Sequence, residues 1–356
     1  MKQRMLISAG AVLIVAGIAA VAGWWRNDEQ AADTDPQVPT TQITTAPVTA
    51  APLPQAAPLQ LNLKVGDRFP LLKTVEQTLS QSSHEGLTKS GSRVELLLEI
   101  QVDEVHADGR KLLSVRYHRV RYSQDVAGRK VDYRSDDPAQ AVPAEALPYH
   151  GLIGNGFSFW VGADNQVIEP VGFDEFLARC VRDVPEPQRQ AVLARFSRVS
   201  AAEGIANFVD DSIGLLPYHS DPAGSGGAVR VGDDWTRRRE ILDPMPLQLQ
   251  TRYTLRELSE TVAEIDILGT IAPSAPAAAV EQVSSEIQVT VRGGHSVGSC
   301  TIDRKTGLPI RSQVRRYLDM HVRRPDGAEF LQRKEVNTTI RAFPAQGATV
   351  EAPSSQ

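Results

Sequence analysis

Cysteine is scarce in this sequence: only Cys180 and Cys300 occur among 356 residues. Two cysteines are too few for a scaffold built on disulfide bonds. Outside the cytoplasm the two could pair, and closing a loop of roughly 120 residues would stabilise the fold by about 4–5 kcal/mol in the chain-entropy picture. Alternatively, each thiol is buried separately as a small apolar side chain. The sequence leaves both alternatives open.

Motifs for metals, phosphates and nucleic acids are also missing. The seven histidines are scattered, and neither H-E-x-x-H nor C-x-x-C spacing occurs. No glycine-rich phosphate loop precedes a helix pattern. The formal net charge of −5 argues against a nucleic-acid partner, because nucleic acids normally require a basic surface. We therefore expect no metal, no cofactor and no nucleic acid.

One motif of catalytic type is present, the G-x-S-x-G segment from Gly294 to Gly298, with Ser296 at its centre. In α/β-hydrolases this pattern presents the serine nucleophile on a strand-to-helix turn. A strand pattern precedes the segment, but residues 299–302 predict another strand rather than a helix. Alternating β and α segments are also missing upstream. We interpret the motif as a glycine-rich hairpin turn and expect no enzyme; a serine hydrolase is the least favoured alternative.

Charge is absent from the twenty-one residues between Met5 and Trp25, which follow Lys2 and Arg4. As a helix this run would be about 31 Å long, which is enough to span a bilayer core. The basic residues predict that the N-terminus stays in the cytoplasm. Residues 1–26 are thus predicted to be a single-pass anchor in the inner membrane, with the domain on the periplasmic side. The alternative is a signal segment cleaved after the A-x-A pattern at 20–22, which would give a secreted protein.

Two low-complexity segments frame the body of the chain. Residues 27–58 are rich in Ala, Thr, Pro and Gln, and residues 344–356 have the same character. Such segments bury too little apolar surface to offset their ordering entropy. We predict a disordered tether at 27–58, an exported α+β domain at 59–343 and a disordered tail at 344–356.

Most of the predicted domain has the patterns of antiparallel strands. Strands are expected at 94–105, 112–122, 131–133, 157–161, 166–169, 247–258, 261–270, 285–291, 301–302, 311–322 and 330–343. A helical insert is expected at about 172–216, because Phe173, Phe176, Leu177, Cys180 and Val181 have helical spacing. Further helices are expected over 188–196 and 201–213. The predicted fold is a large curved antiparallel sheet with a central helical insert, preceded by one transmembrane helix.

A short internal repeat suggests two related halves of the sheet. The segment from Val65 to Phe69 (VGDRF) recurs as the segment from Val231 to Trp235 (VGDDW). Each repeat unit supplies a Gly-Asp turn followed by an aromatic residue. The alternative is two similar turns, each followed by a core aromatic.

Two side-chain groups are candidates for binding. The first group consists of apolar residues of the predicted insert: Phe173, Phe176, Leu177, Phe196, Phe208 and Ile213. Packed against a curved sheet, these residues could leave a lipid-sized cavity between the two layers, or they could form an ordinary packed core. The second is a basic excess in the last strands and in one earlier cluster, which could meet anionic headgroups or be a solvated face: Arg237, Arg238, Arg239, Arg311, Arg315, Arg316, Arg323, Arg324, Arg333, Lys334 and Arg341.

The segment from Thr301 to Arg311 (TIDRKTGLPIR) resembles the Asp-x-x-Thr-Gly-Leu-Pro element of exported half-barrel proteins. These include the lipoprotein-carrier and mycobacterial lipid-binding lipoprotein groups and a periplasmic regulator of an anti-sigma factor. The whole layout also resembles a family of uncharacterised bacterial envelope proteins. The resemblance implies a strongly curved antiparallel sheet with helices on its concave side, which binds acyl chains or a partner's peptide.

Together these patterns predict a non-catalytic cell-envelope protein tethered to the membrane by its N-terminal helix. Its expected role is to bind a hydrophobic ligand such as a lipid, or an envelope protein partner. The alternative is a structural or interaction module without a ligand.

Overall fold

The computed structural model describes residues 56–343, except 84–85, 127, 187, 191–192, 194–215, 217–227, 242–246, 274–279, 285–286 and 325. The predicted anchor or signal segment, nearly all of the predicted tether and the predicted tail lie outside the described residues. Within the described ranges, no helix is long and apolar enough to cross a membrane.

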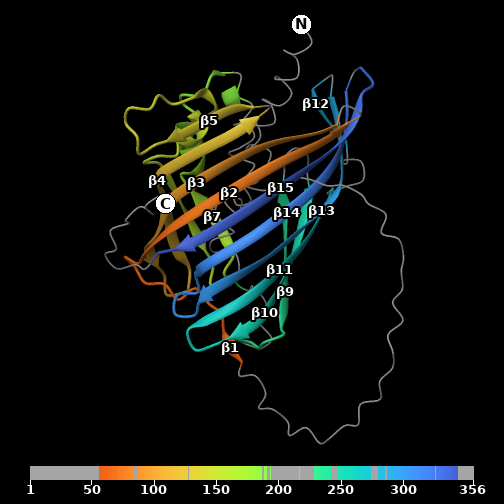
Figure 1. Ribbon diagram of the computed structural model, residues 1–356. Coiled ribbons are helices and arrows are strands. Elements are labelled where there is room, and N and C mark those ends of the chain that lie inside the picture. Colours follow the sequence, from red (N-terminus) through yellow and green to blue (C-terminus); the bar gives the residue numbers. More distant parts are fainter. Residues whose placement is uncertain are drawn as a thin grey trace, which may run out of the picture.

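One antiparallel sheet of thirteen strands dominates the molecule (Figure 1). Neighbouring strands follow the order β7-β6-β4-β3-β2-β15-β14-β13-β11-β10-β9, with β5 beside β4 and β12 beside β13. The strands are β2 (Arg68–Ser83), β3 (Gly86–Val105), β4 (Lys111–Val126), β5 (Arg129–Arg134), β6 (Gly156–Val161), β7 (Val167–Val171), β9 (Asp234–Ile241), β10 (Leu247–Leu258), β11 (Val262–Pro273), β12 (Val280–Ser284), β13 (Ile287–Asp303), β14 (Pro309–Arg323) and β15 (Glu329–Ala342). A separate two-stranded sheet pairs β1 (Ala57–Pro58) with β8 (Ala228–Val229). The last two residues of the predicted tether, Ala57 and Pro58, therefore belong to a strand.

Helices are few in the described chain. They are η2 (Ala144–Ala146), α2 (Leu147–His150) and α3 (Phe173–Cys180), and residues 186, 188–190 and 193 are also helical. The helical spacing from Phe173 is confirmed by α3, whose N-cap Gly172 has a left-handed φ of 69°. The helix expected over 201–213 lies outside the described residues. The described body is thus mostly antiparallel sheet, and the expected α+β class overstated its helix content.

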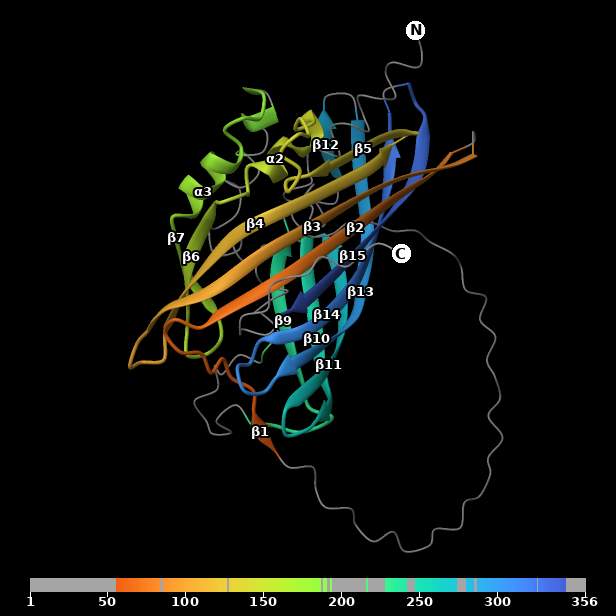
Figure 2. The ribbon, with the colours of Figure 1, turned by 60° about the vertical axis from the view of Figure 1, so that its left-hand side comes forward.

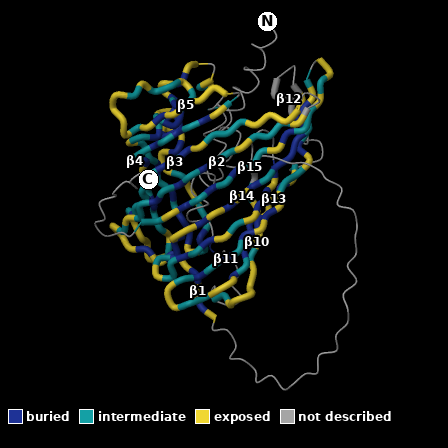
Figure 3. The backbone as a smooth tube through the Cα atoms, in the orientation of Figure 1, coloured by how far each residue is buried: buried dark blue, intermediate teal, exposed yellow. Residues whose placement is uncertain are grey.

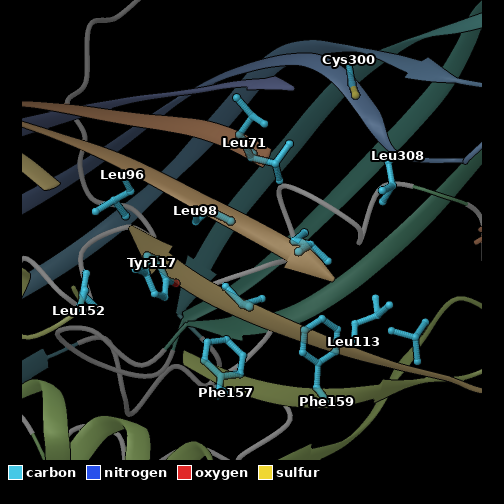
Figure 4. Close-up of a cluster of buried hydrophobic side chains, with 14 of the residues drawn as sticks. Leu71, Leu96, Leu98, Leu113, Tyr117, Leu152, Phe157, Phe159, Cys300 and Leu308 are labelled. Atoms are coloured by element: carbon cyan, nitrogen blue, oxygen red, sulfur yellow. The ribbon is translucent and has the colours of Figure 1, made fainter. Parts of the chain in front are cut away.

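The sheet folds over so that strands from its two ends share one buried core (Figure 2). This main core contains Tyr117 of β4 and Phe159 of β6 together with Tyr253 of β10 and Ile265 of β11. Figure 4 shows side chains of β2, β3, β4 and β6 in the same cluster as Cys300. The buried face is consequently the inner face of a strongly curved sheet, and Figure 3 shows buried and more exposed residues alternating along its strands.

The chain ahead of β2 covers one end of this core. Leu59, Leu61 and Leu63 are buried in alternation with exposed residues. The segment is held against the β13–β14 turn, where the Asn62 amide donates to the Thr306 carbonyl over 3.0 Å. A Cβ at Gly307 would overlap the carbonyl oxygen of Gln60. The D-x-x-T-G turn therefore requires glycine both for its φ of +79° and for this close approach.

The two V-G-D segments form the same turn. In the first, the Lys64 amide donates to the Asp67 carboxylate over 2.8 Å and the Gly66 amide to the Val102 carbonyl over 2.9 Å. In the second, the Arg230 amide donates to Asp233 and the Gly232 amide to the Leu255 carbonyl, each over 2.8 Å. Each turn leads into a strand, β2 or β9, whose first residues pair with the last residues of the following strand. The sequence repeat is therefore also a repeat of local structure.

We predict that Gly307→Ala destabilises the protein more than Gly66→Ala does. Both glycines have positive φ, which costs a residue with a Cβ about 1 kcal/mol. Only the Gly307 substitution also displaces the segment that buries Leu59, Leu61 and Leu63, because open space surrounds the Gly66 Cβ position. We expect urea unfolding to give at least about twice the loss for Gly307→Ala. Equal losses would show that the close approach to Gln60 contributes nothing.

Candidate ligand-binding face

Adjacent basic residues point to opposite faces of the sheet. Arg316 is opposite Val336 on the inner face and is buried, whereas Arg315 is opposite Asn337 and is exposed. Arg237 is likewise buried on the inner face and Arg238 is exposed. The basic excess read from the sequence as one group is therefore divided between two faces by the two-residue period of a strand.

A second apolar cluster lies on the inner face, apart from the main core. Its buried members all come from β10, β11, β13 and β14: Leu247, Leu249, Ile271, Val289, Val291, Leu318, Met320 and Val322. Phe330 of β15 packs against it. In the described part of the chain no helix contributes a residue to this second cluster, whereas the main core includes residues of α2, α3 and the N-terminal segment.

A polar row crosses the inner face between the two clusters. The strand register puts these residues side by side, in the order Arg237, Thr251, Gly269, Ser296 and Arg316. All five are buried. We call this set the arginine row. One nitrogen of the Arg237 guanidinium donates to the Leu216 carbonyl over 2.6 Å.

The G-x-S-x-G segment is not a hairpin turn, so that expectation was wrong. It lies within the single strand β13, with Gly294, Ser296 and Gly298 on the inner face. A Cβ at Gly294 or Gly298 would overlap backbone atoms of β14. Glycine is therefore needed at both positions because the two backbones approach closely. The strand also continues where a nucleophile elbow would turn into a helix.

The predicted ligand contacts on α3 lie in the main core. Phe173, Phe176 and Leu177 are buried, and the ring of Phe157 lies 5.2 Å from that of Phe173 and 4.9 Å from that of Phe176. Tyr117 stacks on Phe176 at 6.0 Å. The other three predicted contacts, Phe196, Phe208 and Ile213, lie outside the described residues. The assignment of these six residues to a ligand pocket remains a prediction.

Both cysteines are free and buried, which supports separate burial rather than pairing. Cys180 ends α3, and Cys300 lies on the inner face of β13. Burial raises the pKa of each thiol to about 12. Neither sulfur is therefore a thiolate nucleophile near neutral pH.

The outer face carries a hollow of about 670 Å³ over β5, β4, β3, β2, β15 and β14. Its lining is polar and internally paired: Arg93 contacts Glu76 at 2.6 Å and Glu95 at 2.5 Å. Asn337 also donates to Glu76 over 3.1 Å. No group of His, Cys, Asp and Glu suited to a metal ion occurs in the described ranges. We therefore regard the inner face as the candidate site.

The fold and this face define a large, strongly curved antiparallel sheet with an apolar, partly cationic inner face. The chain belongs to DUF6263, a family of unknown function, whose sequence model matches residues 108–309, more than half of the chain. A search of curated proteins finds no match.

Three solved structures illustrate the distant structural likenesses. Lipovitellin, in a structure on its lipid–protein interactions, has a TM-score of 0.41 and 10% identity, with 81% of this chain and 26% of that chain covered. DynF from the dynemicin pathway of Micromonospora chersina has a TM-score of 0.18 and 8% identity, with 83% and 92% covered. A DUF1329 protein from Desulfovibrio piger has a TM-score of 0.13 and 9% identity, with 78% and 87% covered. This chain thus spans about a quarter of lipovitellin. With TM-scores this low, none of the three structures supports a conclusion about the function of this chain. These comparisons do not show the resemblance to lipoprotein carriers, which stays an expectation.

We predict that neither cysteine reacts with iodoacetamide at pH 8 in the folded protein, and that both react in urea. The raised pKa keeps the folded thiols protonated, whereas unfolded thiols ionise near their ordinary value of 9.0. By linkage, their contribution to stability is complete below about pH 9 and is lost as the pH rises toward 12. Mass spectrometry counts the alkylated sites, and one modified cysteine under native conditions would contradict the burial.

We also predict that a fluorophosphonate probe does not label Ser296. The hydroxyl lies mid-strand on a buried face, without the turn that exposes a nucleophile. Wild type and Ser296→Ala should therefore show the same background labelling by gel fluorescence. Labelling that disappears only in Ser296→Ala would restore the hydrolase alternative.

Proposed function

We propose that this protein binds a hydrophobic ligand, such as a lipid acyl chain, against the second cluster on the inner face of its sheet. The observation that carries the proposal is the composition of that cluster: eight buried apolar side chains from four neighbouring strands of the curved sheet. A sheet face of this kind must be covered by another apolar layer to leave water.

The two inner clusters suit different roles. In the main core the Phe157 ring of β6 lies against the Phe173 and Phe176 rings of α3 at ordinary packing distances. The second cluster offers aliphatic and thioether groups, among them Met320, whose flexible side chain adapts to irregular partners. We therefore assign ligand binding to the second cluster and a packing role to the Phe157 region.

We further propose that the protein acts in the cell envelope without catalysis. The charge-free run from Met5 to Trp25 would tether it to the inner membrane, and residues 27–58 would let the body stand off the bilayer. In this arrangement the ligand would be an envelope lipid, exchanged with the membrane or with a protein partner.

We predict that Met320→Gln weakens the binding of monoolein about tenfold. The substitution keeps the side-chain volume but sets an amide into the second cluster, which costs apolar contact and leaves polar groups to be satisfied. Isothermal titration calorimetry on the full chain measures the affinity. His321→Gln is the matched control, because the next residue of β14 points to the outer face.

Melting curves of both variants should confirm that they fold before their affinities are compared. Native mass spectrometry of the wild-type chain, gently extracted from membranes, should reveal bound lipid. A ligand-free mass together with no measurable monoolein binding would refute the proposed function.

A further inference from the structure

The hollow of about 670 Å³ lies on the outer face of the sheet, opposite the apolar clusters. A volume of this size is typical of ligand sites in proteins. We infer that this hollow is a second binding site, which holds a neutral oligosaccharide laid across the strands. The inference goes beyond the proposed function, because it concerns the other face of the sheet and a polar ligand.

The strand register arranges the outward side chains of the hollow in two neighbouring rows. The first row crosses from β14 to β5 in the order Arg315, Asn337, Glu76, Arg93, Ser123 and Asp132. The second row runs beside it in the order Glu335, Thr78, Gly91, Asp125 and Lys130. The other lining residues are the strand positions between these rows: Gln77, Ser92, Gln124 and Val131.

The lining is long enough for a chain of several sugar rings. It includes residues of six neighbouring strands, β5, β4, β3, β2, β15 and β14, which Figure 1 shows side by side. Neighbouring strands lie about 4.8 Å apart, so the lining extends for about 24 Å across the sheet. A linear oligosaccharide matches this length better than a single ring.

Small residues form the floor in the middle of the hollow. Thr78 of β2 pairs with Gly91 of β3, and Ser123 of β4 lies diagonal to that glycine. A Cβ at Gly91 would meet only the Gln77 carbonyl oxygen within 4 Å, at 3.6 Å. The space above this glycine is therefore open, and a side chain placed there would fill the floor.

The charges of the lining favour a ligand without net charge. Three cations lie among four carboxylates, so neither sign prevails: Arg93, Lys130 and Arg315, with Glu76, Asp125, Asp132 and Glu335. No aromatic ring lines the hollow in the described chain, and Val131 is the one aliphatic residue, which disfavours an apolar ligand. A sugar hydroxyl both donates and accepts hydrogen bonds, so it can pair with either kind of group.

A chain of hydrogen bonds holds part of the lining in place before any ligand binds. Arg93 donates to one Glu76 oxygen over 2.6 Å, and Asn337 donates to the other over 3.1 Å. Gln313 in turn donates to the Asn337 side-chain oxygen over 3.2 Å. Because these planar groups are already ordered, binding costs less side-chain entropy. A carboxylate has about four acceptor sites, so Glu76 can also accept from a sugar hydroxyl.

Other lining groups are not used by the protein itself. Among the described residues, the Arg315 guanidinium and the hydroxyls of Thr78 and Ser123 have no side-chain partner. None of the three residues is buried, so water satisfies these groups in the free protein. Ligand hydroxyls can replace that water with equivalent hydrogen bonds.

The test uses three neutral hexasaccharides: maltohexaose, cellohexaose and chitohexaose. Calorimetry on the full chain should show saturable binding of at least one, with a dissociation constant below about 1 mM. The monosaccharide unit of that chain should bind at least about tenfold more weakly, because it reaches only part of the lining. A hexapeptide of alternating glutamate and lysine is the charged comparison.

Gly91→Val should weaken the binding of that hexasaccharide at least about tenfold, because the new side chain fills the floor. Valine favours strands, whereas glycine weakens them, so the melting temperature should be kept or raised. Ser299→Val is the matched control, at an exposed outward position of β13 that does not line the hollow. Gly91→Ala should give a smaller loss, and it decides the question if Gly91→Val does not fold.

Arg315→Met should weaken the same binding about fivefold, because a charged donor is lost from one end of the first row. Arg311→Met is its matched control, since Arg311 is exposed on the same strand and face but does not line the hollow. Monoolein binding should be the same in all these variants, because the second cluster lies on the opposite face.

The outcomes separate this site from the proposed function. Failure of all three hexasaccharides to bind, or equal losses in the hollow variants and their controls, would overturn the oligosaccharide site and leave the hydrophobic site standing. A monosaccharide that binds as tightly as its chain would overturn the extended site. A hexapeptide that binds as tightly as the best hexasaccharide would overturn the ligand class.

Discussion

The pairing of β2 with β15 holds this fold together. It joins Leu71–Ser82 to Leu331–Ala342, segments about as far apart in the described chain as any two can be. On one side of this seam lie β3, β4, β6 and β7, and on the other β14, β13, β11, β10 and β9. Without the seam the two runs of strands would present open edges, and the interior would lose the wall that closes it. Contacts of this sequence separation also form late, because their loop entropy must be offset first.

Once β2 and β15 are paired, the two-residue period of the strands determines which side chains face the interior. A register shift of one residue would turn the apolar set of β14 outward and bring its charged set inside. The extra residues Arg292 in β13 and His118 in β4 interrupt the pairing, and each changes which residues of its strand face the interior further along. The set of side chains on the inner face therefore depends on the register of every strand pair.

The sequence predicts regular strands well and interrupted ones poorly. The expected strand at 247–258 matches β10 at both ends, because polar and apolar residues alternate there almost without exception. In contrast, β2 carries Lys73 and Gln77 on its inner face, so its pattern does not reveal a buried strand. The sequence patterns predicted two separate strands within β13, because glycines such as those at 293–294 normally mark turns. In the structure the glycines at 294 and 298 allow close packing within one strand. The arginine row could not be predicted from the sequence, because sequence alone does not tell which of two neighbouring arginines, such as Arg315 and Arg316, faces the interior. The strand pairing decides this.

The glycines of β13 also bear on the spacing of the strands that form the inner face. Gly294 and Gly298 let β13 approach β14 more closely than side chains would permit. A single methyl group at either position would push the two strands apart and flatten the wall. Two positions on one strand therefore limit which side chains this part of the inner face can carry.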